Sequence, residues 1–129
     1  MLAKTDYALR AVVSLARAQD ACLSSQAIAD QQQIPQGFLE HILTDLRRAG
    51  VVTSRRGGRG GYRLAVAPGE LSLADIINAV DPDFLRRPES ASGSADPAGD
   101  AVGVVWSALE SDLQRFFEGM TLRDVVERH

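Results

Sequence analysis

The fold is decided by one stretch of the sequence, Arg55-Arg56-Gly57-Gly58-Arg59-Gly60-Gly61-Tyr62-Arg63. Short apolar segments flank it, at residues 51–54 and 61–65, so we predict a β-hairpin with this tract as its loop. Glycines permit a tight reversal and a close approach to phosphate, and arginines supply positive charge there. A flexible linker is the alternative, but the flanking strands and the helix before them argue against it. A nucleotide-binding loop would need Gly-x-x-x-x-Gly-Lys, and Lys4 is the only lysine.

Two helices joined by a turn precede this hairpin. Ser24 can cap the first of them, with Leu23 and Ile28 placed to form a hydrophobic staple. The turn follows at residues 33–35, because a residue before proline resists helical geometry. The second helix ends at Gly50, and its apolar face consists of Leu39, Ile42, Leu43 and Leu46. Such a pair can place its second helix in the major groove of DNA, although an ordinary three-helix core would have the same pattern.

One more helix is expected on each side of this unit. A first amphipathic helix, from about residue 6 to residue 18, carries Leu9, Val12, Val13 and Ala16 at helical spacing. A fourth helix begins after Ser72, which has Asp75 at the capping-box position, and ends near Asp81. The expected fold class is therefore mainly α with a small β-hairpin, a winged helix-turn-helix DNA-binding domain over residues 1–81.

The remaining residues are expected to form a loop and a long helix. Residues 86–100 are poor in apolar groups and rich in Pro, Gly, Ser and Ala, so we expect a flexible loop over residues 82–100. Residues 101–129 would hold a long helix ending near Gly119 and a short last helix capped by Thr121. The long helix carries a heptad seam made of Val102, Trp106, Leu109, Leu113, Phe116 and Met120. The seam could pack on its own domain or on a second copy, and its length favours dimerisation.

The charge is divided unevenly along the chain. The net charge is -3 over 129 residues, but residues 1–66 carry a balance of +4 and residues 67–129 a balance of -7. Six arginines and no acidic residue lie between Arg47 and Arg63, inclusive. Such a local field can hold phosphates on an acidic protein. No apolar run is long enough to span a membrane, so we expect a cytoplasmic protein without membrane association.

The second helix of the pair is expected to read DNA bases with its first residues. Gln36 can pair with adenine, His41 can donate to a purine acceptor, and Phe38 could meet a thymine methyl group. Arg59, at the tip of the hairpin, could enter a narrow minor groove. The other residues expected at the DNA are Ser24, Gly37, Glu40, Arg47, Arg55, Arg56, Gly60 and Tyr62.

The single cysteine, Cys22, lies before the second helix. It could be a thiol redox sensor or a small, partly buried side chain, and the second interpretation is favoured because no lysine or arginine lies within two residues of it. His41 has no second histidine or cysteine nearby, so no metal site is expected. No nucleophile–base arrangement or carboxylate pair is found, so we expect no catalytic residues and no enzymatic activity.

The sequence also resembles the Rrf-type winged-helix transcription regulators, a bacterial family that includes IscR, NsrR and CymR. The matching stretches are TDYALR (5–10), IA (28–29), FLEHIL (38–43), LRRAGVV (46–52) and RGGRGGYRL (56–64), with weaker matches over residues 73–81 and 106–125. The resemblance spans nearly the whole chain. It implies a homodimer built through the long C-terminal helix, which binds a palindromic operator in double-stranded DNA and usually represses. It also implies that the start of the first helix, near Thr5 and Tyr7, lies against the DNA backbone.

One departure from the family pattern bears on cofactors. Cluster-binding members carry three cysteines in the loop and at the start of the long helix, whereas residues 82–105 here contain none. Iron–sulfur clusters need thiolates, so we predict no cluster and no other cofactor. The alternatives to a DNA-binding regulator are a protein-partner-binding module on the same fold and a redox sensor acting through Cys22. An unidentified small-molecule or protein effector would act at the loop, near Phe84 and Trp106.

Overall fold

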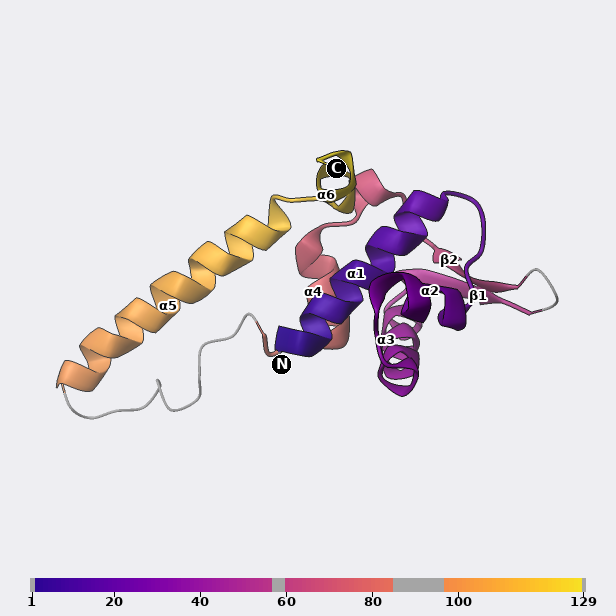
Figure 1. Cartoon of the computed structure of the whole chain (residues 1–129). Helices are drawn as coiled ribbons and strands as arrows, with labels where there is room; N and C mark the ends of the chain where they lie inside the picture. The colour runs from indigo at the N-terminus through magenta and orange to yellow at the C-terminus, as the bar shows by residue number, and fades with distance from the viewer. Residues whose placement is uncertain (1, 57–59, 85–96, 129) are drawn as a thin grey trace.

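The computed structural model of the chain describes residues 2–56, 60–84 and 97–128. The described part is mainly α-helical with one two-stranded antiparallel hairpin, so the predicted fold class is confirmed (Figure 1). The elements in chain order are α1 (Leu2–Ala18), α2 (Ser25–Gln32), α3 (Gln36–Arg48), β1 (Val52–Arg55), β2 (Gly61–Leu64), the 3-10 turn η1 (Pro68–Glu70), α4 (Leu73–Val80), α5 (Pro97–Glu118) and α6 (Leu122–Glu127).

The helix α1 is the centre of the core. It contacts α2, α3, α4, α6 and β2, which is why side chains on several of its sides are buried. The residues of α1 without any exposed surface are Ala8, Ala11, Val12 and Leu15. The predicted Leu9, Val13 and Ala16 are only partly buried, so the buried face is centred about one position earlier than predicted. The apolar face predicted for α3 is confirmed, since Leu39, Ile42, Leu43 and Leu46 are fully buried.

The ends of the helix pair follow from local signals. Ser24 caps α2, and its hydroxyl accepts a hydrogen bond from the Ala27 backbone N–H at 3.0 Å. Gln33 ends α2 in the left-handed conformation, with φ of 56°. Gly50 has φ of +81° just after α3, where a residue with a side chain would be strained. The end of α2 at Gln33 and the start of α3 at Gln36 confirm the predicted turn at residues 33–35.

The hairpin continues directly from α3. Its register pairs Val52 with Leu64 and Arg55 with Gly61, and Val52 is 1% exposed because it reaches into the core. The strands agree with the predicted segments to within one residue. Residues 57–59, which include the predicted tip residue Arg59, lie outside the described part.

The C-terminal end of the chain returns to the N-terminal body. Ser72 with Asp75 and Thr121 with Asp124 both form capping boxes, as their spacing indicated for α4. The two N-caps lie side by side, because the Leu73 N–H donates to the Met120 carbonyl at 2.9 Å and the Leu122 N–H donates to the Leu71 carbonyl at 2.8 Å. Leu122 has no exposed surface and belongs to the same core cluster as α1. This closure was not predicted.

The long helix α5 projects away from this body (Figure 1). It begins at Pro97, so the last four residues of the expected loop are helical. Proline is suited to the first helical position, because its missing N–H has no partner there in any case. The rest of the expected loop from residue 85 to residue 96 lies outside the described part. None of the described helices is long and apolar enough to cross a membrane.

Candidate nucleic-acid interface

The outward face of α3 is the first part of the candidate interface. Burial of the opposite face turns Gly37, Glu40 and His41 toward solvent. A Cβ atom on Gly37 would meet nothing within 4 Å, so the space in front of the first turn is open. Arg47 and Arg48 are exposed at the other end of the helix. The face therefore offers hydrogen-bonding groups along its length and positive charge at its end.

Gln36, the first residue of α3, is already engaged within the protein. Its Nε2 donates to the Ser25 Oγ at 2.8 Å, which links α3 to the start of α2. Its Oε1 is buried and has no hydrogen-bond partner in the described part of the chain. The predicted contact with adenine would therefore require the Gln36 amide to leave Ser25.

The rings of Phe38 and Tyr7 pack against each other as an edge-to-face pair. Their ring centroids are 5.4 Å apart with an interplanar angle of 78°, and both side chains are partly buried against the core. Such pairs stabilise by about 0.5–1.5 kcal/mol beyond the area that they bury. The pair therefore holds the start of α3 on α1, and the contact of Phe38 with a thymine methyl group stays a prediction.

The side chain of Thr5, a residue predicted to lie near the DNA backbone, is buried in the structure. Thr5 is 3% exposed, because it lies one turn before Ala8 on the face of α1 that packs in the core. Thr5, Ala8, Val12 and Leu15 follow one another at spacings typical of a buried helix face. A side chain in that position supports the helix from inside, and the contact of the start of α1 with the DNA backbone stays a prediction.

The hairpin brings a second group of arginines beside α3. Arg55, at the end of β1, and Arg56 are exposed, and Gly60 is partly buried where the chain returns. Because β1 follows α3 after a short turn, these side chains and Arg47 are exposed within one short stretch of the chain. Arg59 is not among the described residues, so its place at the tip stays a prediction.

Tyr62 has a structural part in this surface that the sequence did not indicate. Its backbone carbonyl accepts from the Leu23 N–H at 2.9 Å, and its own N–H donates to the Leu23 carbonyl at 2.7 Å. The pairing fixes β2 against the segment that begins α2, next to Ser24. The ring of Tyr62 packs on the core. The hairpin is thus held to the start of the helix pair through β2.

Gly61 makes that pairing possible. Its φ is +135°, and a Cβ atom there would lie 2.4 Å from the Leu23 carbonyl oxygen. Backbone atoms this close leave no room for a side chain, so only glycine fits. The sequence pattern indicated a need for glycines in the tract, but it could not identify which one is required.

An ion pair links α1 to α3. Lys4 Nζ lies 3.0 Å from Asp45 Oδ2, with both side chains 30% exposed. Partial exposure limits the stabilisation from such a pair to about 0.2–1 kcal/mol. The two residues are far apart in the sequence, so no local signal could have revealed the pair.

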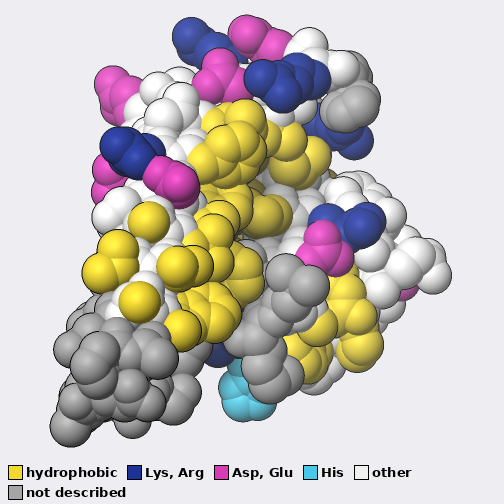
Figure 2. All heavy atoms as spheres, turned by 90° about the vertical axis from the view of Figure 1, so that its left-hand side faces the viewer, with side chains coloured by type: hydrophobic (Ala, Val, Ile, Leu, Met, Phe, Trp, Pro, Cys, Tyr) yellow, Lys and Arg dark blue, Asp and Glu magenta, His cyan; other side chains and the backbone are white. Residues whose placement is uncertain are grey.

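The predicted dimerisation seam on α5 is divided between two environments. Four members are exposed: Val102 (52%), Trp106 (38%), Leu109 (45%) and Phe116 (56%). Leu113 packs on Ala74 and Ile77 of α4, and Met120 packs on the main core, so these two residues also hold α5 to its own body. Hydrophobic side chains gather along this side of the molecule, over α5 and the surface beside it (Figure 2).

The chain does not supply the donors of an iron–sulfur cluster. Cys22 is the only cysteine in the sequence, and it is partly buried between α1 and α2. No group of three or more His, Cys, Asp or Glu side chains within residues 2–56, 60–84 and 97–128 could hold a metal ion. A cluster needs several thiolates, so the residues of one chain do not fit it.

Comparison with known proteins identifies the relatives of the chain. The sequence model of the Rrf2 family, described as an iron-dependent transcriptional regulator, matches residues 1–128. A Mycobacterium tuberculosis H37Rv protein, provisionally named an HTH-type transcriptional regulator, is 37% identical, with 98% of this chain and 80% of that protein covered. The HTH-type transcriptional regulator IscR of Aliivibrio salmonicida is 30% identical, with coverage of 98% and 76%. The solved structure of CymR, the global cysteine regulator of B. subtilis, matches with a TM-score of 0.80 and 26% identity, with coverage of 98% and 95%.

Proposed function

Because the chain belongs to the Rrf2 family of DNA-binding transcriptional regulators, we propose that it acts as a homodimeric repressor that binds a palindromic operator without an iron–sulfur cluster. The observation that supports the DNA-binding surface is the exposure of arginines at the end of α3 and in the hairpin that directly follows it. Arg47, Arg48, Arg55 and Arg56 are all exposed there. A positive surface of this kind provides the phosphate contacts that hold a protein on DNA.

In the proposed function, α3 and the hairpin together recognise the base sequence of the operator. Gly37, Glu40 and His41 point outward on a helix whose other face is buried, the arrangement needed for a helix in the major groove. The hairpin would then lie along the neighbouring backbone or minor groove, with Arg59 at its tip. Gln36 would join the base contacts only after its amide exchanges Ser25 for DNA.

The proposed dimer rests on the exposed apolar side chains of α5. Val102, Trp106, Leu109 and Phe116 are between 38% and 56% exposed, which is costly for large apolar groups on one helix face. A second copy of the same face would cover them in a two-fold arrangement. Two α3 helices related by a two-fold axis read a palindrome, with half-sites about 34 Å apart. Repression is what the family resemblance implies.

The absence of a cluster is proposed from the donor set alone. With Cys22 as the only thiol, one chain cannot provide the ligands of a cluster. Protein purified without oxygen should therefore be colourless. A brown protein with visible absorbance would contradict this part of the proposal.

The proposed function is tested by sequencing the genomic fragments that co-purify with the protein. We expect one enriched inverted repeat, a gel shift with that fragment, and two chains per fragment. Deletion of the gene should raise transcription from the same promoter. A lack of enriched fragments would contradict the DNA-binding surface, an asymmetric site occupied by one chain would contradict the dimer, and lowered transcription would contradict repression.

A further inference from the structure

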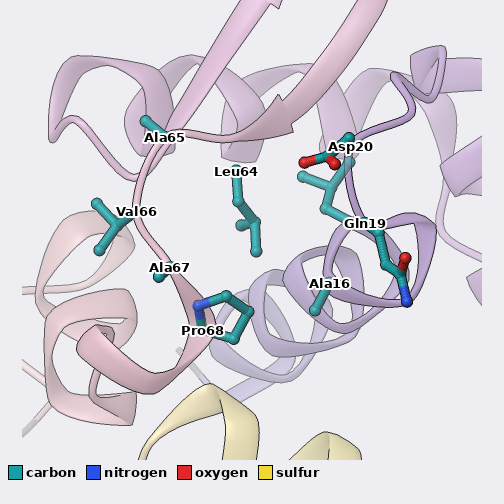
Figure 3. A pocket seen from close by; sticks show the side chains of 9 residues that line it. Ala16, Gln19, Asp20, Leu64, Ala65, Val66, Ala67 and Pro68 are labelled. Atoms are coloured by element: carbon teal, nitrogen blue, oxygen red, sulfur yellow. The ribbon is translucent and has the colours of Figure 1, made fainter.

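A cavity of about 390 Å³ opens between the end of α1 and the chain that leaves β2 (Figure 3). Its walls are mainly apolar, with Leu15 on the side of α1 and Leu64, Val66 and Pro68 on the other side. Ligand pockets in proteins have volumes of roughly 300–1,000 Å³, so the cavity is large enough for a small organic molecule. It lies apart from the residues assigned to DNA and to the dimer.

Asp20 places one charge at the rim of this cavity. It lies two residues after the end of α1, and its carboxylate points toward Leu64 (Figure 3). Within the part of the chain that the structure describes, the carboxylate has no hydrogen-bond or ion-pair partner, although Arg17 is one turn away. The C-terminal end of α1 adds a partial negative charge equivalent to roughly half an elementary charge. The electrostatic environment therefore favours a cation.

We propose that the cavity binds a small primary amine in its ammonium form, with an apolar body of a few carbon atoms or one ring. The apolar body would pack against Ala16 on the side of α1 and Leu64 on the other side, and the ammonium group would pair with the Asp20 carboxylate. An anionic ligand of the same shape would be repelled by Asp20 and by the end of α1. A neutral apolar molecule would leave the carboxylate unpaired.

One wall of the cavity is connected to the hairpin and to α3 by backbone hydrogen bonds. Leu64 pairs with Val52 in the hairpin, and the Ala65 N–H donates to the Val51 carbonyl at 2.9 Å. The Val51 N–H in turn donates to the Leu46 carbonyl of α3 at 2.9 Å. A ligand that joins Asp20 to this wall therefore stabilises one position of the hairpin relative to α1. The amine acts as an effector of operator binding, and this part rests on the proposed function.

The binding site is tested by NMR titration of the protein with 2-phenylethylammonium chloride. We expect saturable shifts at the amides of residues 64–67 and weakening by about two- to fivefold in Asp20→Asn, because a partly exposed ion pair is lost. Ala67→Leu should fill the cavity and abolish binding, and Glu127→Gln, an exposed change on α6, should leave it unchanged.

The anion 3-phenylpropionate has a comparable apolar body and should not bind. Circular dichroism verifies that each variant is folded. Absence of saturation, equal affinity in Asp20→Asn, or equal binding of the anion would overturn the site.

The regulatory part is tested by gel shift with the co-purified operator fragment. Saturating 2-phenylethylammonium should change the operator affinity of the wild type at least threefold, with no change in Asp20→Asn. Unchanged wild-type affinity would overturn regulation, while the NMR titration decides the binding site separately. If no fragment is bound even without amine, the failure is that of the proposed function.

Discussion

Gly61 lies where the hairpin closely approaches the segment before α2. A Cβ atom there would lie 2.4 Å from the Leu23 carbonyl oxygen at a φ of +135°. We therefore expect Gly61→Ala to lower the free energy of unfolding by about 2 kcal/mol or more, as strained or displaced backbone does. Gly37→Ala is the matched control, because its Cβ would meet no atom and α3 would gain at most about 1 kcal/mol. Urea denaturation measures both, and equal stabilities would show that the close approach is not required.

Asp124 makes the last helix sensitive to acid. The Thr121 backbone N–H donates to the Asp124 carboxylate at 2.9 Å, and this bond, with the Thr121 side chain as the second cause, lowers the pKa of Asp124 below 3.8. A lowered pKa in the folded state means that this stabilisation is present above the unfolded pKa of 3.8 and is lost as the pH falls through the folded pKa. We expect Asp124→Asn to be less stable than the wild type at pH 7 and the difference to shrink below pH 3.8. Urea denaturation at both pH values, with Glu127→Gln as control, tests this; a difference that stays constant with pH would contradict it.

At the scale of helices and strands, the features that depend only on neighbouring residues could be predicted from the sequence. The caps at Ser24, Ser72 and Thr121 act within three residues, and the face of α3 follows from its own periodicity, so all were recognisable. Contacts between distant segments have no such local signal. The Leu23–Tyr62 pairing and the Lys4–Asp45 ion pair were therefore missed. Thr5 was assigned to the DNA side by resemblance, although burial places its side chain inside.

The element that gives the clearest prediction is α5. Leu109 is 45% exposed on the apolar face, whereas Val104 is 69% exposed at a heptad position away from that face. We expect Leu109→Asp to weaken the dimer at least about 100-fold, since it removes an apolar contact and introduces a charge at the seam. Val104→Asp adds the same charge and should leave the dimer intact. Sedimentation equilibrium measures both, and equal dissociation constants would contradict a dimer built on this face.

At the scale of the whole molecule, positive charge is separated from negative charge. The net charge is -3, yet the stretch from Arg47 to Arg63 has six arginines and no acidic residue. Arg56→Gln should therefore reduce the slope of log affinity against log salt by about 1.8, from two lost phosphate contacts per dimer at about 0.9 each. Arg115 pairs with Asp112 on α5, so the control Arg115→Gln should not alter the slope. Fluorescence anisotropy at several salt concentrations gives both slopes, and an unaltered slope for Arg56→Gln would remove Arg56 from the interface.

The return of α6 to the body also constrains how the chain folds during synthesis. Leu122 is fully buried in the same core as α1, and its N–H is bonded to Leu71. A ribosome that has translated the hairpin has therefore not yet delivered the side chain that completes this core. The body that carries the proposed DNA-binding surface reaches its final stability only after α5 and α6 have left the exit tunnel. A nascent chain consequently carries the exposed apolar side chains of α5 by the time its own core can close.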